Sequence, residues 1–249
     1  MKVVLLGDSI TQGLGSKTVN FQRALQERMQ PEDTILNWAL TGTTVDYIQQ
    51  LLRDFEKERP DVAVILYGNV DAQIKPNRTG KIFPRIPGRL GAENGCMILP
   101  RPFYSHRPLK RLLQRLENLA RTILRKLVYA VDGTEQWMPI DPFMKQLGNA
   151  CQELCALGVR PVICSTVYLD ERLFPGSNAE YQKYNARMQE YALEEDIAFL
   201  DIYNVLRQRV EIDGWKSCYN EDHFHPNGSG YLLIAEQIAA VLRSEAQND

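Results

Sequence analysis

A short apolar run near the start of the chain passes directly into a glycine and a serine. Residues 2–6 (Lys-Val-Val-Leu-Leu) are rich in apolar and β-branched side chains and predict a buried parallel strand. Gly7 allows a tight turn, and Ser9 stands where the next helix could begin. A strand that ends this way can present a hydroxyl nucleophile at the carboxyl edge of an α/β sheet. Alternatively, Asp8, Ser9 and Thr11 only cap a turn, since such residues often start helices.

A second polar stretch lies near the other end of the chain. Asp222 is followed three residues later by His225 and then by Pro226. Serine is a weak nucleophile at neutral pH, so it needs a base within hydrogen-bond reach and a third group that orients this base. A carboxylate three residues before a histidine can orient it within one local turn, and proline suits the first position of a helix. This stretch therefore supplies a candidate base and its orienting carboxylate.

Together the two stretches resemble the first and last signature blocks of the SGNH hydrolases, also called the GDSL esterase/lipase family. The matching residues are Gly7-Asp8-Ser9-Ile10-Thr11 and Asp222-x-x-His225-Pro226. The resemblance implies a catalytic triad of Ser9, His225 and Asp222 that needs no metal and no cofactor. His223 is a competing base, but only His225 has the three-residue offset from Asp222 that the family motif shows. We interpret His106 as a loop histidine.

Between these blocks the chain alternates short apolar runs with longer amphipathic stretches. Strands are predicted at residues 34–38, 62–66, 161–165 and 197–202, and helices at 19–29, 45–58, 142–157, 180–195 and 230–243. With the first strand, this alternation predicts a three-layer α/β/α sandwich around a five-stranded parallel sheet. The family resemblance adds a flavodoxin-like strand order, which spacing alone does not give.

Length and composition predict a single domain over residues 1–249. A chain of 249 residues with 44% hydrophobic content can bury one substantial core, and a net charge of −2 gives no bulk attraction to polyanions. No signal peptide precedes the first strand and no apolar run is long enough to span a bilayer, so we expect a cytoplasmic protein. Scattered cysteines predict reduced, buried thiols rather than disulfides or a zinc site: Cys96, Cys151, Cys155, Cys164 and Cys218.

The turns after the second and third predicted strands are expected to complete an oxyanion hole with the Ser9 N–H. Gly42 stands where the family's second block has a glycine whose N–H faces the oxyanion, although on its own it could be an ordinary turn glycine. The family's third block is Gly-x-Asn-Asp, whereas residues 68–71 read Gly-Asn-Val-Asp and place Val70 at the asparagine position. Either Asn69 takes the donor role after a local adjustment, which we favour, or the hole relies on backbone N–H groups. The final aspartate of this block is expected to brace the loop by hydrogen bonds.

An insertion at about residues 72–131 departs from the regular alternation and is strongly basic. Between residues 72 and 126 it has thirteen Lys or Arg and two Glu, so its charge is 13 − 2 = +11 and the rest of the chain has −2 − 11 = −13. Prolines and glycines exclude a regular helix from its first half, which we interpret as a long loop beside the active-site edge. Arginine forks bind carboxylate and phosphate well, so Arg78, Arg85 and Arg89 are candidate substrate-binding residues.

The second half of this insertion, residues 109–131, predicts an amphipathic helix with a leucine-rich stripe and a basic opposite face. The simplest interpretation packs the stripe on the core and leaves the basic face in solvent. Alternatives are an anionic sugar or nucleotide-sugar substrate, a peripheral contact with a phospholipid surface, or a protein partner. Nucleic acid is disfavoured, because no known docking module is present and aromatic residues are not interleaved with the charges.

These observations predict a serine esterase that cleaves a small acyl ester, preferably an acetyl ester. The family resemblance suggests a carbohydrate substrate, and the basic insertion suggests an anionic glycan or glycolipid. Two alternatives stay open. One is an O-acyltransferase with the same triad, and the other is a non-catalytic glycan- or membrane-binding protein, which Val70 and the basic helix suggest. Trp38 could either wall an acyl pocket or pack in the core.

Overall fold

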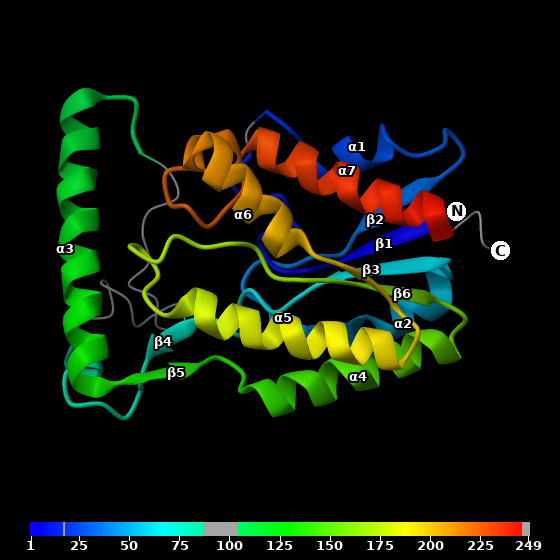
Figure 1. Ribbon diagram of the computed structural model, residues 1–249, viewed down its shortest axis with the longest axis horizontal. Helices are drawn as coiled ribbons and strands as arrows, with labels where there is room; N and C mark the ends of the chain where they lie inside the picture. Colours follow the sequence, from blue (N-terminus) through cyan, green and yellow to red (C-terminus); the bar gives the residue numbers. More distant parts are fainter. Residues whose placement is uncertain (17, 87–103, 246–249) are drawn as a thin grey trace.

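The computed structural model of this chain describes residues 1–16, 18–86 and 104–245. Its centre is a sheet of five strands in the order β2-β1-β3-β6-β7 (Figure 1), in which every neighbouring pair is parallel. This is the doubly wound, flavodoxin-like order, so the predicted fold class is confirmed. The strands are β1 (Lys2–Gly7), β2 (Thr34–Asn37), β3 (Val62–Leu66), β6 (Arg160–Cys164) and β7 (Ala198–Leu200).

Helices cover both faces of this sheet (Figure 1). One face is covered by α1 (Phe21–Gln26), α6 (Ile202–Asp213) and α7 (Gly228–Glu245), and the other by α2 (Ile48–Glu58), α4 (Ile140–Ala156) and α5 (Ser177–Glu194). All residues of β3 are buried, as are Val3 to Gly7 of β1, because these strands lie between two helical layers. Both strands therefore read as continuous apolar runs in the sequence.

The predicted helices and strands of the sandwich are present, with ends shifted by a few residues. A single 3₁₀ turn, η1 (Val45–Tyr47), forms the start of the predicted helix at 45–58. The sequence prediction missed α6. The Asp201 side chain caps it by accepting the Asn204 N–H, and its buried residues include Ile202, Leu206 and Val210 at helical spacing.

The basic insertion forms a small substructure of its own. Its two short strands, β4 (Ile74–Pro76) and β5 (Thr134–Gln136), pair antiparallel and hold the ends of the segment together. Between them lie a 3₁₀ turn, η2 (Phe83–Arg85), and the long helix α3 (Pro108–Asp132). Figure 1 shows α3 standing at one end of the molecule, beyond the carboxyl ends of the sheet strands. The predicted helix at 109–131 is therefore confirmed.

The orientation of α3 is the reverse of the predicted one. Most of its leucines point away from the body of the protein, and Leu116 is 55% exposed, whereas Arg125 is only 2% exposed. Leu124 is the exception among the predicted stripe residues, because it packs inward with Val128 against Phe83. The polar side faces inward because its side chains find specific partners there. The Arg125 guanidinium lies 5.4 Å above the Phe174 ring, and the Asp132 carboxylate accepts the N–H groups of residues 81–83. The interpretation in which the stripe packs on the core is wrong.

The four described cysteines are free thiols, and Cys96 lies outside the described residues. Cys151, Cys164 and Cys218 are buried as predicted, but Cys155 is exposed. The buried side of α4 is formed by residues such as Leu147 and Leu154, and Cys155 falls beyond its edge. Among the residues described, no helix is both long and apolar enough to cross a bilayer.

Candidate active site

Ser9 is held in the turn that follows β1. The Ser9 carbonyl accepts the Leu14 N–H at 2.9 Å, which closes the turn on itself. Gly7 is required where the strand ends, because a Cβ at this position would lie 2.1 Å from Thr11 Oγ1 and 2.8 Å from the Leu66 carbonyl oxygen. The close approach of these groups fixes the direction in which Ser9 leaves the sheet.

His225 lies in a loop between the 3₁₀ turn η4 (Trp215–Ser217) and α7. The Asn220 N–H and side-chain amide each donate to the His225 carbonyl oxygen at 3.0 Å. Asp222 Oδ1 accepts the N–H groups of Phe224 and His225, both at 3.2 Å. These bonds hold the carboxylate and the imidazole within one compact turn.

The serine turn and the histidine loop are packed directly on each other. Gly15 is required at their contact, because a Cβ there would lie 2.5 Å from Asn220 Nδ2 and 2.8 Å from His225 Cβ. The Tyr231 hydroxyl of α7 donates to the Leu14 carbonyl oxygen at 2.7 Å. The last helix thereby holds the histidine loop against the turn that carries Ser9.

This packing produces a continuous chain of hydrogen bonds between the three residues of the predicted triad. Ser9 Oγ lies 3.1 Å from His225 Nε2, and His225 Nδ1 lies 2.6 Å from Asp222 Oδ2. All three side chains are buried. If Asp222 accepts the Nδ1 proton, Nε2 has a free lone pair that faces the serine hydroxyl. The arrangement has the geometry of a nucleophile, a base and an orienting carboxylate.

The chain matches the model of the GDSL-like Lipase/Acylhydrolase family over residues 5–233. The chain belongs to this family. It is accordingly a hydrolase of ester bonds, which confirms the predicted enzyme class.

Solved structures of the same fold include several described as esterases or acylhydrolases. A catalytic mutant of the acetylxylan esterase Axe2 from Geobacillus stearothermophilus is 14% identical, with a TM-score of 0.60 over 96% of this chain and 92% of that one. The lipase/acylhydrolase from Enterococcus faecalis is 16% identical, with a TM-score of 0.60 over 98% and 96%. A GDSL-like lipase from Bacteroides thetaiotaomicron is 16% identical, with a TM-score of 0.58 over 98% and 88%. No curated protein matches the chain by sequence.

His223, the other histidine of the C-terminal motif, contacts residues outside the predicted triad. His223 Nδ1 lies 2.7 Å from Asp170 Oδ2, and the His223 ring stacks on Trp215 with an interplanar angle of 8°. Burial raises the pKa of Asp170, but hydrogen bonds from His223 and Arg172 outweigh burial and hold this pKa well below its usual range. Sequence reasoning missed this second His–Asp pair, because Asp170 stands 53 positions away from His223 with no local motif to mark it.

Two backbone N–H groups of the GDSL-like fold are free for an oxyanion. Neither the Ser9 N–H nor the Gly42 N–H donates a hydrogen bond to any of the residues that the structure describes. Gly42 is exposed in the turn after β2, and no atom lies within 4 Å of where its Cβ would be. Free, preorganised donors of this kind can stabilise charge that develops only in the transition state.

Asn69 of this acylhydrolase is used in the interior of the protein. Its side chain is completely buried, and its Oδ1 accepts the Val167 N–H at 2.9 Å. Its Nδ2 lies near the Asp8 carboxylate but donates no hydrogen bond to any of the described residues. Its burial and the bond from Val167 argue against its assignment to the oxyanion hole, which stays a prediction. Val70 stands at the position where the family has asparagine, and its side chain cannot donate a hydrogen bond.

Asp71 braces the loop after β3, as predicted. Its carboxylate accepts the Val45 N–H at 2.9 Å and the Gly68 N–H at 3.0 Å. Burial raises the pKa of Asp71 to about 7, against the effect of these hydrogen bonds. Burial likewise raises the pKa of Asp8 to about 6, although the Ile10 N–H and the nearby His225 favour its charged form. Two carboxyl groups beneath the site therefore titrate close to neutral pH.

The candidate substrate-binding arginines lie on the basic insertion, and no hydrogen bond among the described residues joins them to the triad. Arg78 lies 5.3 Å above the Trp137 ring, and Arg85 donates to the Lys81 carbonyl oxygen. Arg89 lies outside the described residues. Their role in substrate binding stays a prediction. His106 is exposed in the loop before α3, as expected, and Trp38 packs edge-on against Phe55 at 4.9 Å.

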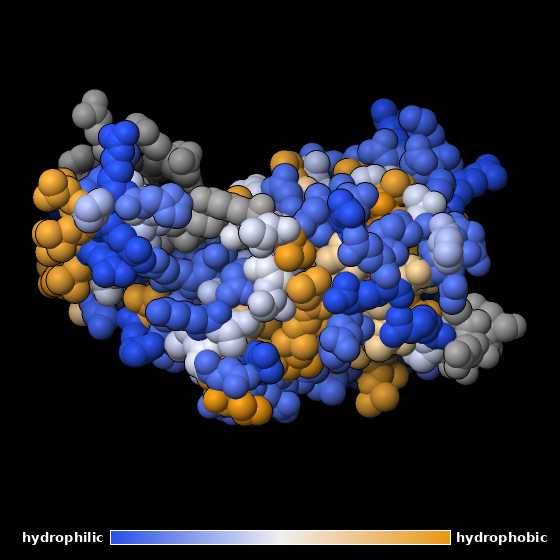
Figure 2. Space-filling model, turned by 90° about the horizontal axis from the view of Figure 1, so that it is seen from above, coloured by the Kyte–Doolittle hydropathy of each residue, from blue (hydrophilic) through white to orange (hydrophobic). Residues whose placement is uncertain are grey.

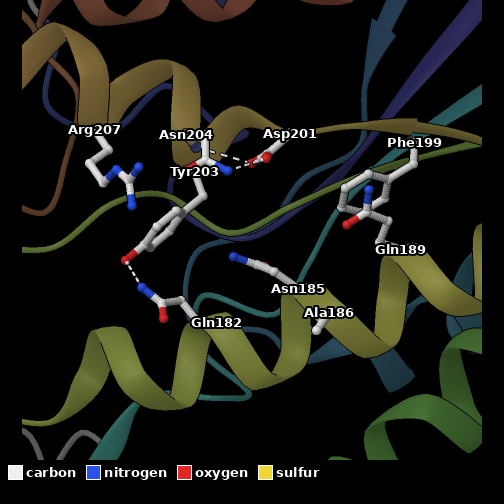
Figure 3. A pocket seen from close by; sticks show the side chains of 9 residues that line it. All are labelled: Gln182, Asn185, Ala186, Gln189, Phe199, Asp201, Tyr203, Asn204 and Arg207. Atoms are coloured by element: carbon white, nitrogen blue, oxygen red, sulfur yellow. Dashed lines mark hydrogen bonds between the residues drawn. The ribbon is translucent and has the colours of Figure 1, made fainter.

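A polar hollow of about 260 Å³ lies between α5 and α6 (Figure 3). The Tyr203 hydroxyl and the Gln182 amide form a hydrogen bond of 3.0 Å across it. None of its lining residues belongs to the triad, so it is not part of the candidate active site. The lining residues are Gln182, Asn185, Ala186, Gln189, Phe199, Asp201, Tyr203, Asn204 and Arg207.

Proposed function

We propose that this acylhydrolase is a serine esterase that cleaves small acyl esters with Ser9, His225 and Asp222. The observation that carries the proposal is the uninterrupted path from Ser9 Oγ through the imidazole to the Asp222 carboxylate, with separations of 3.1 and 2.6 Å. A serine hydroxyl gains nucleophilicity only when a base can take its proton as it attacks, and this path supplies both the base and the group that orients it.

In the acylation step, Ser9 Oγ attacks the carbonyl carbon of the ester and its proton passes to His225 Nε2. Asp222 holds the Nδ1 proton and stabilises the imidazolium that forms. The carbonyl oxygen becomes an oxyanion, and the free N–H groups of Ser9 and Gly42 donate to it. When the tetrahedral intermediate collapses, the bond to the alcohol breaks and the leaving alkoxide takes the proton from Nε2. The acyl group stays on Ser9.

In the deacylation step, water attacks the acyl carbon of Ser9 while His225 takes one of its protons. The second tetrahedral intermediate collapses with cleavage of the bond to Ser9 Oγ, which regains its proton from Nε2. A carboxylic acid leaves, and the site returns to its starting state. The His225 imidazole accepts and returns every proton that moves in these two steps, so the proposed steps use no metal or cofactor.

For the substrate we propose O-acetyl groups on a carbohydrate. Structures of this fold described as an acetylxylan esterase and an acetyl-xylooligosaccharide esterase support this choice by analogy of fold. The charge of +11 on residues 72–126 extends the proposal to an anionic glycan.

The experiment compares turnover of p-nitrophenyl acetate, longer p-nitrophenyl esters and acetylated xylooligosaccharides by wild type, Ser9→Ala and Ser244→Ala. Ser244 is an exposed serine at the end of α7 and is the matched control. We expect Ser9→Ala to lose roughly 10⁴-fold or more in kcat, and Ser244→Ala to lose nothing. Transfer of acetyl to an added sugar in preference to water would identify an O-acyltransferase instead. Full activity of Ser9→Ala would refute the proposed nucleophile.

A further inference from the structure

The outer side of α3 is an apolar stripe with no protein packed against it among the described residues. Its eight side chains are between 50% and 77% exposed. They lie on one side of a helix that spans Pro108–Asp132. Figure 2, in which this helix is seen nearly end-on, shows orange surface at that end of the molecule. A contiguous exposed apolar surface of this kind marks a site that binds another protein or a membrane. The α3 stripe consists of Leu109, Leu112, Leu113, Leu116, Leu119, Ile123, Leu127 and Val131.

The opposite side of α3, which has polar side chains together with Val128 and Leu124, is fixed to the protein by specific contacts. The Tyr129 hydroxyl donates to the Ile74 carbonyl oxygen at 2.8 Å, and the Gln114 side chain accepts the Ser105 N–H at 2.7 Å. The Asp132 carboxylate accepts three consecutive backbone N–H groups of residues 81–83. Because these contacts specify the rotation of the helix about its axis, the outward direction of the α3 stripe is a property of the fold.

Positive charge borders the α3 stripe. With 3.6 residues per turn, Arg115 and Lys126 lie along one margin and Lys110 lies near the other, and all three are exposed. Of the two acidic residues of α3, Glu117 lies nearer the stripe by helical spacing, and it is paired with Arg121 at 2.6 Å. Over Pro108–Asp132 the chain has six Lys or Arg and two acidic residues, so its charge is 6 − 2 = +4.

These features together match the physical requirements of a helix that lies in a membrane interface. Such a helix needs a long apolar face, a charged opposite face and cationic margins that meet anionic headgroups. We propose that α3 lies flat in the surface of an anionic bilayer, with the α3 stripe inserted among the upper acyl chains. A second copy of the chain suits the stripe less well, because symmetric contact would bring two basic helices together. The stripe also has no aromatic residue, whereas the residues that dominate protein–protein affinity are enriched in Trp and Tyr.

Bilayer contact at α3 would also place the catalytic loop near the membrane. Arg111 and Arg115 both form ion pairs with Glu221, the residue immediately before Asp222. The helix therefore contacts the histidine loop directly.

The test is co-sedimentation of the full chain with vesicles of phosphatidylcholine alone or of phosphatidylcholine with phosphatidylglycerol. We compare wild type with Leu112→Gln/Leu116→Gln/Leu119→Gln and with Leu193→Gln, an 83% exposed leucine of α5 that serves as the matched control. Wild type and Leu193→Gln are expected to bind anionic vesicles more tightly than neutral ones. Loss of three inserted leucines should weaken binding by about 100-fold or more. All variants should keep p-nitrophenyl acetate turnover, which shows that they are folded.

A charge variant separates the electrostatic part of the interaction from the insertion of apolar side chains. Lys110→Gln/Lys126→Gln should lose about five-fold per removed charge on anionic vesicles and nothing on neutral ones. Equal sedimentation of wild type and the triple leucine variant, or absence of wild-type binding, would overturn the proposal. Analytical ultracentrifugation is run in parallel. A wild-type dimer that the leucine substitutions convert to a monomer, without vesicle binding by either, would assign the stripe to a second copy and would also overturn it.

Discussion

The Ser9 hydroxyl lies 3.1 Å from Nε2 of His225, although 216 positions separate the two residues in the chain. The first strand of the sheet ends at the serine turn, and the last helix begins just after the histidine loop. Gly15 and Tyr231 hold these two segments together. The catalytic function that we propose depends on this single contact between the two ends of the fold.

Replacement of Asp222 by Asn tests whether the carboxylate orients the base. Asp222 Oδ2 lies 2.6 Å from His225 Nδ1 and can only accept, so it selects the tautomer in which Nε2 faces Ser9. An amide can donate to Nδ1 and so favour the wrong tautomer. We expect kcat for p-nitrophenyl acetate to fall by about 10⁴-fold with little change in KM.

His223→Gln is the matched control for this measurement. His223 is two positions from His225 but pairs with Asp170 and stacks on Trp215. This variant should keep a kcat close to that of wild type. A loss of activity by His223→Gln as large as that of Asp222→Asn would contradict the assignment of His225 as the base.

Asn69→Ala distinguishes a structural role from an oxyanion role. The Asn69 side chain is fully buried and accepts the Val167 N–H, so its removal leaves a buried donor without a partner. We expect the free energy of unfolding to fall by about 1–3 kcal/mol. We expect kcat per active site, counted by fluorophosphonate titration, to change little. A loss of about 10²–10³ in kcat with unchanged stability would instead establish Asn69 as an oxyanion donor.

Val70→Asn tests whether the site lacks a side-chain donor. Val70 stands where the family's third block has asparagine, and it is nearly buried beside the fixed loop of Asp71. An amide here should add a third donor and raise kcat on p-nitrophenyl acetate by up to about 10²-fold. Val70→Leu, which is close to asparagine in size but has no polar side-chain atom, is the control and should not raise kcat. Equal rates for wild type and Val70→Asn would show that two backbone donors suffice.

The raised pKa of Asp71 predicts how stability depends on pH. Burial raises this pKa from 3.8 to about 7, so between these values the folded protein holds a proton that the unfolded chain has released. Stability therefore falls as pH rises through this interval, by at most about 1.4 kcal/mol per pH unit for this group. Asp71→Asn cannot titrate. Urea unfolding at several pH values between 5 and 8 should show the difference between variant and wild type shifting in favour of the variant as pH rises.

The contribution of Asp8 to this pH dependence has the same sign and is present in both proteins, and the negative charge of Asp8 also helps to raise the pKa of Asp71. Parallel stability curves for wild type and Asp71→Asn would mean that the Asp71 carboxyl has an ordinary pKa in the folded state.

The sheet could be predicted from sequence because its strands are buried on both faces. Residues 62–66 and 2–6 read as unbroken apolar runs for this reason. The strands β4 and β5 could not be predicted, because each has three residues and pairs with a partner about 60 positions away. The helical spacing of Ile202, Leu206 and Val210 could have predicted α6. Most of the other residues of this helix are polar, which makes the pattern hard to recognise.

The triad residues could be proposed from sequence because each signature block has its functional residues within five consecutive positions. Contacts between distant segments could not be proposed in this way, and the pair of Asp170 with His223 is an example. The direction of α3 is another. Periodicity identifies an apolar side of a helix but does not say what faces it, and here the contacts of Arg125 and Asp132 decide the matter.

The most direct test of the central claim is labelling by a fluorophosphonate probe, followed by peptide mapping. We predict one covalent adduct on the peptide that contains Ser9, absent from Ser9→Ala and formed much more slowly by Asp222→Asn. Unmodified wild-type protein, or an adduct on a serine other than Ser9, would contradict the account.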